Sequence, residues 1–194
     1  MLPTREQAEA LLLEAAQCNP GQWDDHSRTA AHCAEAIAAA CGLDAEKAYI
    51  VGLLHDIGRK FGKRHLGHVS DGSSYMMSLG YDEAARICLT HSFSSLSLDD
   101  YIGKFDTTPD ELELIQNALS GIEMDEYDKL IQLCDALAGA EGVVDMDARM
   151  EDIRRRYGSY PPEKRAANFA LKEHFEALAG RDIYDIVDKE HYHP

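Results

Sequence analysis

Almost every segment of this chain carries the signals of an α-helix, and no segment carries those of a β-strand. Apolar residues recur at three- and four-residue spacing, as in Ala30, Cys33 and Ile37, and no window alternates apolar and polar residues between turns. Apolar residues make up 45% of the 194 residues, enough for a sizeable core. We therefore expect an all-α protein, a compact helical bundle with little or no sheet.

Capping and breaking residues set the expected helix boundaries. Thr4 and Gln7 match a capping box, Asp44 can cap a helix, and Gly42 and Gly58 stand where helices should end. Turn signals fill 92–110, and a short turn is expected at 182–187. The expected helices span 5–18, 25–41, 45–57, 70–79, 82–91, 110–119, 126–140, 147–157 and 162–179.

The charge of the chain narrows its possible partners. It has 19 Lys and Arg against 35 Asp and Glu, a net charge of −16 with His neutral. Binding to DNA, RNA or an anionic membrane surface depends on clustered basic residues, so we expect neither a long nucleic acid nor a membrane as partner. Nine His in so acidic a chain favour a cation instead.

The N-terminus and the cysteines bear on location. Residues 1–17 lack the basic start and cleavage site of a signal peptide, and the most apolar run, 48–54, is too short to span a bilayer. The five cysteines are odd in number, widely spaced and without a C-x-x-C pair. We expect reduced thiols and a cytoplasmic protein.

Five ionisable residues project from the apolar faces of four expected helices. They are His26, His55, Asp56, His91 and Asp135. A single His or Asp on such a face is most often a hydrogen-bonded core residue. Burying all five without partners would cost several kcal/mol, whereas one shared metal would satisfy them together. The joint pattern therefore indicates a metal site inside the bundle.

The other histidines and one arginine run favour no site. His32 shares a helix side with Arg28 and Glu35, so we expect it on the surface. We expect structural or disordered positions for His174 and for the tail residues His191 and His193. The run 154–156 (Arg154, Arg155 and Arg156) points in several directions from one helix, and we interpret it as surface.

The order of these residues resembles the HD-domain superfamily of metal-dependent phosphohydrolases. Its signature is an early His, a His-Asp doublet ending an apolar helix, and a late Asp; here these are His26, His55-Asp56 in LLHDIG, and Asp135. The resemblance covers about 23–144. Because no linker or repeat divides the chain, we expect one HD-type helical domain over 1–194, with the metal-site core at about 23–144 and a helical extension at about 145–194.

A second pattern resembles the binuclear branch of that superfamily. His68, four residues before Gly72, and His91 match the stretch that supplies two more ligands, with His65 as a substitute for His68. The resemblance implies one or two divalent or transition metal ions, with Fe or Mn favoured and Ni, Co, Zn or Mg also open. It assigns His26, His55, Asp56 and Asp135 to one ion, and Asp56, His68 and His91 to the other, with Asp56 bridging and Asp56 and His55 as catalytic residues.

The implied reaction is hydrolysis of small phosphate esters, with nucleotides as the expected substrates. Two neighbouring cations would bind a bridging hydroxide at neutral pH, and it would attack phosphorus. Four basic residues that follow the doublet would bind the substrate phosphate: Arg59, Lys60, Lys63 and Arg64. The alternative for this segment is a solvated loop.

Several motifs leave the substrate open. The layout is similar to HD-type diadenosine tetraphosphate hydrolases, but Ser92-Phe93-Ser94 follows His91 where they have a Thr-x-Gly-like stretch. Asp135 precedes Ala136 instead of Lys, and the Gly-Tyr-Pro motif of cyclic-di-GMP phosphodiesterases is absent, since Ser159 precedes Tyr160-Pro161.

Two other functions are compatible with these residues. An HD-type di-iron oxygenase acting on a small phosphonate or polyol would use the same six ligands. A non-catalytic nucleotide or metal sensor would need fewer of them. Whether the chain forms an oligomer stays open.

Overall fold

The computed structural model describes all 194 residues and confirms an all-α protein. Two 3-10 helices, η1 (Ile57–Phe61) and η2 (Leu98–Asp100), and a two-stranded hairpin, β1 (Ala138–Gly139) and β2 (Gly142–Val143), accompany the α-helices. The α-helices are α1 (Arg5–Cys18), α2 (Trp23–Cys41), α3 (Ala45–Leu54), α4 (Gly67–Ser78), α5 (Asp82–Thr90), α6 (Pro109–Ser120), α7 (Glu126–Leu137), α8 (Met146–Tyr157), α9 (Pro162–Ala179) and α10 (Ile183–Ile186).

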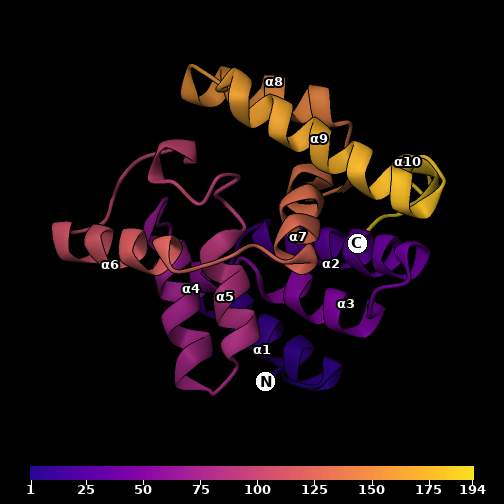
Figure 1. The fold of residues 1–194 in the computed structure, drawn as a ribbon. Helices are drawn as coiled ribbons and strands as arrows, with labels where there is room; N and C mark the ends of the chain where they lie inside the picture. Colours follow the sequence, from indigo (N-terminus) through magenta and orange to yellow (C-terminus); the bar gives the residue numbers. More distant parts are fainter.

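Helices α2 and α3 lie at the centre of the arrangement (Figure 1). On one side α1 and α5 pack against α3, and α4 packs against α5 and η1, around buried residues such as Leu12, Leu53 and Met76. On the other side α7, α9 and α10 pack against α2, and α8 packs against α7, with Ile131 and Phe175 in that core. None of the helices combines the length and apolarity that crossing a bilayer requires.

Small residues let the central helices approach closely. A Cβ atom added to Gly52 on α3 would lie 3.0 Å from Cα of Ala31 on α2. Alanines at 30, 31 and 34 are fully buried along that face of α2. The short side chains therefore fix the depth at which α3 sits against α2, and with it the position of the residues that end α3.

A second close approach joins η1 to α4. A Cβ atom on Gly58 would lie 2.0 Å from the carbonyl oxygen of His68, and one on Gly72 would lie 3.2 Å from Cβ of Cys88. No other residue type fits at Gly58 unless the backbone moves. Glycines thus hold the segment after α3, the start of α4 and the end of α5 in one tight layer.

Most helix ends agree with expectation, and two differ in a way that matters for the site. Thr4 and Gln7 form the expected capping box, and Asp44 caps α3. The expected helix 45–57 is too long, because α3 ends at Leu54 and a 3-10 helix follows. The expected helix 126–140 is also too long, because the chain leaves α7 at Leu137 to form the hairpin.

A buried polar network joins the end of α5 to α7. Asp128 is fully buried and accepts hydrogen bonds from Arg86 and from Oγ1 of Thr90. Gln132, one turn further along α7, donates to the carbonyl oxygens of Thr90 and Phe93. These bonds hold the residues on both sides of His91.

Substituting Gly58 tests the tight layer. We expect Gly58→Ala to lower the free energy of unfolding by about 2–3 kcal/mol, because the new Cβ overlaps backbone atoms that cannot rotate away. Urea unfolding at pH 7 measures this. Gly121→Ala is the matched control, since its Cβ would meet nothing closer than 3.7 Å. Equal stability of the two variants would contradict the expectation.

Candidate metal centre

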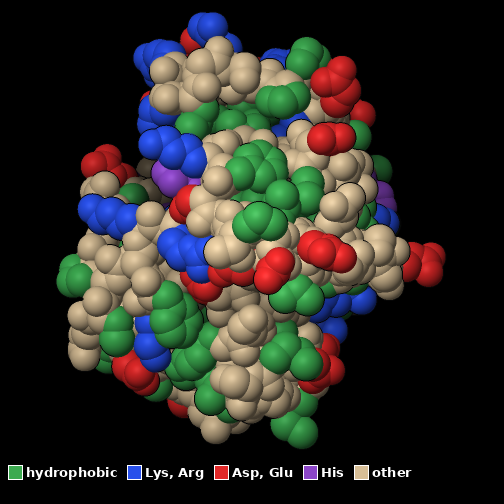
Figure 2. All heavy atoms as spheres, turned by 90° about the vertical axis from the view of Figure 1, so that its left-hand side faces the viewer, with side chains coloured by type: hydrophobic (Ala, Val, Ile, Leu, Met, Phe, Trp, Pro, Cys, Tyr) green, Lys and Arg blue, Asp and Glu red, His purple; other side chains and the backbone are tan.

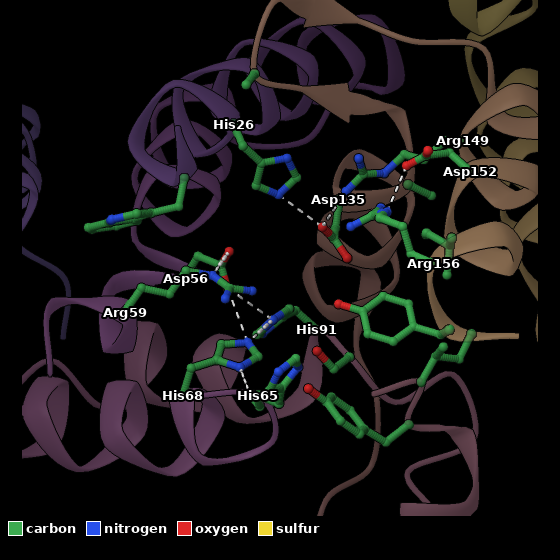
Figure 3. Close-up of a pocket in the computed structure, with 18 of the residues that line it drawn as sticks. His26, Asp56, Arg59, His65, His68, His91, Asp135, Arg149, Asp152 and Arg156 are labelled. Carbon is green, nitrogen blue, oxygen red and sulfur yellow. Dashed lines mark hydrogen bonds and ion pairs between the residues drawn. The ribbon is translucent and has the colours of Figure 1, made fainter. Parts of the chain in front are cut away.

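Six side chains converge where several helices end or begin, and Figure 3 labels all of them except His55. His55 and His91 are the residues that directly follow α3 and α5, and Asp56 precedes η1. His26 and His68 lie near the starts of α2 and α4, and Asp135 lies in the last turn of α7. The structure thus brings together all the residues expected as metal ligands: His26, His55, Asp56, His68, His91 and Asp135.

The early end of α3 lets two consecutive residues face the same space. Neighbouring side chains on an α-helix point about 100° apart, so a continuous helix would aim His55 and Asp56 in different directions. The backbone leaves the helical conformation at Asp56, and His55 Nε2 lies 3.9 Å from Asp56 Oδ2. Both side chains are almost fully buried.

All four histidines among the candidate ligands direct the same ring nitrogen, Nδ1, at a backbone carbonyl. His55 Nδ1 lies 2.7 Å from the oxygen of Gly52, and His91 Nδ1 lies 2.9 Å from that of Cys88. His68 Nδ1 contacts the oxygen of His65, which also stands three residues earlier, and His26 Nδ1 lies 3.0 Å from the oxygen of Ala138 in the hairpin. A carbonyl only accepts, so each Nδ1 carries the proton and each Nε2 keeps a lone pair.

The lone pairs of these Nε2 atoms face other electron-pair donors, either a second Nε2 or a carboxylate oxygen. His68 Nε2 and His91 Nε2 are 3.2 Å apart, and His26 Nε2 lies 3.0 Å from Asp135 Oδ1. His55 Nε2 and Asp56 Oδ1 are buried without any hydrogen-bond partner. Groups arranged in this way repel one another. A cation between them would offset the repulsion and would accept the lone pairs that have no hydrogen-bond partner. The residues therefore fit a metal ion.

The donor set is nitrogen and oxygen without sulfur, which suits Fe, Mn, Zn and similar ions. Two groups have one donor atom each within 4.8 Å of all the others in the group: His26, His55 and Asp135, and His55, Asp56 and His91. His68 Nε2 lies 3.1 Å from Asp56 Oδ1, next to the second group. The division between two ions, with Asp56 bridging, stays a prediction.

Burial favours the neutral form of two of these histidines, the form in which an imidazole binds a metal. It lowers the pKa of His91 to about 3 and also lowers the pKa of His26. For Asp56, burial alone would raise the pKa, but the charge of Arg59, whose Nε donates to this carboxylate, holds its pKa well below the ordinary value. The pKa of Asp135 is likewise lowered against its burial, with the charge of Arg149 among the causes. Both carboxylates are ionised at neutral pH.

A family model of the HD domain matches residues 23–140, more than half of the chain. The chain belongs to the HD-domain family. Most members of this family are metal-dependent hydrolases, and the convergent His and Asp side chains could hold the metal. No curated protein and no solved structure gives a significant match.

The HD-domain site opens into a cavity of about 870 Å³. Six basic residues line it against three acidic ones, although the whole chain has an excess of acids. In the space-filling view a histidine is visible between Lys and Arg side chains in a hollow of the surface (Figure 2). The basic residues are Arg59, Lys63, Arg64, Arg149, Arg156 and Lys164, and the acidic ones are Asp56, Asp135 and Asp152.

The four basic residues expected to bind phosphate are placed differently from one another. Arg59 donates from Nε to Asp56 Oδ2 at 2.5 Å and lines the cavity, and Lys63 stands exposed at its rim. Arg64 also reaches the cavity, but Asp71 and Glu111 hold its guanidinium. Lys60 is not brought to the site. It points away from the cavity and pairs with Glu14, because η1 turns its side chain toward α1.

His65 contributes by its backbone. Its carbonyl oxygen contacts His68 Nδ1, and its ring lines the cavity 6.2 Å from the ring of Tyr157 without joining either ligand group. This placement favours His68 as the ligand.

Several cavity residues were not expected from the sequence. Arg149 lies 3.8 Å from Asp135 Oδ1, and Lys164, Tyr101 and Tyr160 form part of the wall. Arg149, Tyr160 and Lys164 come from residues 145–194, beyond the family match. Only their helical periodicity is visible in the sequence, so no local signal marked them.

The remaining histidines lie elsewhere. The expectation that His32 is on the surface is wrong, because the C-terminal tail covers it: Nε2 lies 2.9 Å from the oxygen of Val187, and the ring stacks on Tyr192. His174 contacts Glu126, and His191 and His193 contact Asp188 and the Glu141 carbonyl. Arg154, Arg155 and Arg156 are exposed, as expected, and Arg156 also reaches the cavity rim (Figure 3).

Removing the central carboxylate tests the metal centre. We expect Asp56→Ala to purify with less than about a tenth of the metal of the wild type, since even outer-shell changes cost 10–100-fold in affinity. Elemental analysis after reloading with Mn²⁺ or Fe²⁺ measures this. Asp185→Ala, on the exposed face of α10, is the control. Equal metal content in both variants would contradict the assignment.

The low pKa of His91 predicts acid sensitivity of the metal-free protein. Below pH 6.5 the unfolded chain takes up a proton on this imidazole, while the folded protein does not until about pH 3. Stability is therefore lost as the pH falls, by about 2 kcal/mol between pH 7 and 5 from His91 alone.

Urea unfolding of the chelator-treated protein at pH 7 and pH 5 measures this loss. His91→Gln should lose correspondingly less over the same interval, whereas the control His174→Gln should behave like the wild type. An unchanged pH dependence in His91→Gln would show that His91 is not the source.

Proposed function

We propose that this HD-domain protein is a metal-dependent hydrolase of small phosphate esters, with nucleotides as the expected substrates. One observation carries the proposal: the ligand cluster opens into a cavity in which six basic residues face three acidic ones, in a chain of net charge −16. Two of those three acids, Asp56 and Asp135, are ligand candidates, so the six basic residues face only one other carboxylate, that of Asp152. Such a wall attracts a small anion.

The proposed assignment places one ion on His26, His55, Asp56 and Asp135, and a second on Asp56, His68 and His91. When bound, the metal supplies a Lewis acid for phosphoryl oxygens and acidifies a water molecule. The protein itself would contribute in two ways. Backbone carbonyls fix the orientation of each imidazole, and the ionised carboxylates would balance the charge of the metal.

Arg59 is the residue best placed to bind the phosphoryl group. Its Nε is held by Asp56, which leaves the remaining guanidinium N–H groups for an anion in the cavity. Asn19 donates to the Arg59 carbonyl at 2.6 Å and so ties this segment to the end of α1. Arg59 therefore stands beside the ligands in a fixed orientation, ready to stabilise charge that develops on phosphate oxygens.

The cavity also offers apolar surface. Trp23, Tyr101 and Tyr160 contribute to its lining beside the basic residues. Flat aromatic rings next to cations suit a substrate that has both a planar group and phosphate, as nucleotides have. This combination supports nucleotides over simple phosphate esters.

A phosphate-release assay tests the proposal. The protein of residues 1–194 is loaded separately with Mn, Fe, Co or Ni and offered nucleoside mono-, di- and triphosphates and simple phosphomonoesters. We expect turnover of at least one nucleotide and a loss of more than about a hundredfold in Asp56→Ala, beyond the range for outer-shell residues. Asp185→Ala should match the wild type.

Other outcomes would contradict the hydrolase proposal. No phosphate release with any metal, together with O₂ consumption by the Fe-loaded protein and a phosphonate or polyol, would indicate the oxygenase alternative. Nucleotide binding without turnover or O₂ consumption would indicate a sensor.

A further inference from the structure

Lys164 differs from every other basic residue of the protein. Of the 19 Lys and Arg side chains, only Lys63, Lys104, Lys164 and Arg181 have no carboxylate within 4.0 Å. Lys63, Lys104 and Arg181 are exposed to solvent, whereas Lys164 is half-buried in the cavity wall. It is thus the one sheltered cation without an anionic partner, an arrangement that costs free energy unless a ligand supplies the anion.

Two backbone carbonyls hold the ammonium group in place. Lys164 Nζ donates to the oxygen of Ser92 at 2.7 Å and to that of Asp100 at 2.9 Å. An ammonium group has three N–H donors, so one is left. Burial lowers the pKa of Lys164, and the carboxylates of Asp135 and Asp100 oppose this from a distance.

The other cations of the cavity are already engaged or stand in solvent. Arg59 is bound to Asp56, Arg64 to Asp71 and Glu111, and Arg156 to Asp152. Arg149 lies beside the ligand Asp135 (Figure 3). Lys164 is therefore the cation in the sheltered wall whose charge is free for a ligand.

Lys164 lies apart from the place beside the metal ligands where the phosphoryl group would bind. Lys164 lies on α9, beyond the HD-domain match at 23–140, and forms no ion pair with the candidate ligands Asp56 and Asp135. Arg59, in η1, already contacts the candidate ligand Asp56. A cation that faces the same cavity from a different wall suits a different part of the substrate.

We infer that Lys164 binds a second anionic group of the substrate, a phosphate or carboxylate separate from the phosphoryl group held at the metal ligands. This inference rests on the proposed function for the identity of the first anion. It makes residues 145–194 the part of the chain that selects esters with two anionic groups over esters with one.

Non-hydrolysable anions test the inference by binding alone. Calorimetry on the Mn²⁺-loaded protein of residues 1–194 compares methylphosphonate with alkylene diphosphonates and phosphonocarboxylates with spacers of one and three carbons. We expect at least one probe with two anionic groups to bind about tenfold or more tightly than methylphosphonate, which has one. About tenfold is the range for a hydrogen bond to a charged group. The diphosphonate and carboxylate series show which second anion is preferred.

Two variants separate charge from anchoring. Lys164→Met removes the ammonium and both hydrogen bonds, while Lys164→Gln keeps an amide that can donate to the carbonyls. Both should lose the tenfold preference and leave methylphosphonate affinity unchanged. Lys172→Met, a half-buried lysine of the same helix outside the cavity, should keep the preference. Thermal melting and Mn²⁺ content check that each variant is folded and loaded.

Each outcome decides the inference. If the wild type binds no probe with two anionic groups more tightly than methylphosphonate, the inference is overturned. An equal loss for all probes in Lys164→Gln would also overturn it, and would mark Lys164 as an anchor of the 92–100 segment. Should Lys164→Met fail to fold, Lys164→Gln alone decides. A Lys164-dependent preference without phosphate release in the turnover assay would sustain the inference and reject the hydrolase function.

Discussion

The six candidate ligand side chains share one buried space at a cost in free energy that a cation between them would offset. Four imidazoles with inward lone pairs and two ionised carboxylates repel one another at separations near 3 Å, as between His68 and His91. Backbone carbonyls enforce this arrangement, since they hold the protonated nitrogen of every ring outward. Three of these carbonyls stand three residues before their histidine, so the local chain path at a helix end presets the orientation of the ring.

The positions of those helix ends depend in turn on close packing of small residues. Gly52 sets the depth of α3 against α2, and Gly58 and Gly72 press the following segment against α4 and α5. Asp128 and Gln132 hold the residues around His91 from α7. A metal centre needs its donors in place within fractions of an ångström, and a packed interior transmits any displacement. Stability and the geometry of the candidate metal centre are therefore coupled in this protein.

Electrostatics divides the cavity into two parts. The ligand end carries the carboxylates, and the remaining wall carries basic residues that contrast with the acidic surface of the whole chain. Half of those basic residues, including Arg149 and Lys164, belong to the region beyond the family match. In the proposed enzyme, the HD-domain part would supply the chemistry shared with the family, and the C-terminal helices would supply the selection of substrate.

The sequence by itself determined the fold class and the family. Helical periodicity, caps such as Thr4 and Asp44, and the order His26, His55-Asp56, Asp135 are local or sequential features, and a chain displays them before it folds. The sequence could not show that α3 stops at Leu54 or that α7 gives way to a hairpin, because these breaks arise from packing against α4 and α2.

Only the tertiary structure decided which charges meet in the cavity. Lys60 and Arg59 are neighbours in the sequence, yet one pairs with Glu14 outside the cavity and the other binds Asp56 inside it. Lys164 comes to the wall from more than 70 residues beyond His91, through hydrogen bonds to backbone carbonyls that carry no sequence signal. The physical reason is that charge–charge interactions depend on distance in space, and a helical sequence pattern specifies which face is buried but not what it meets.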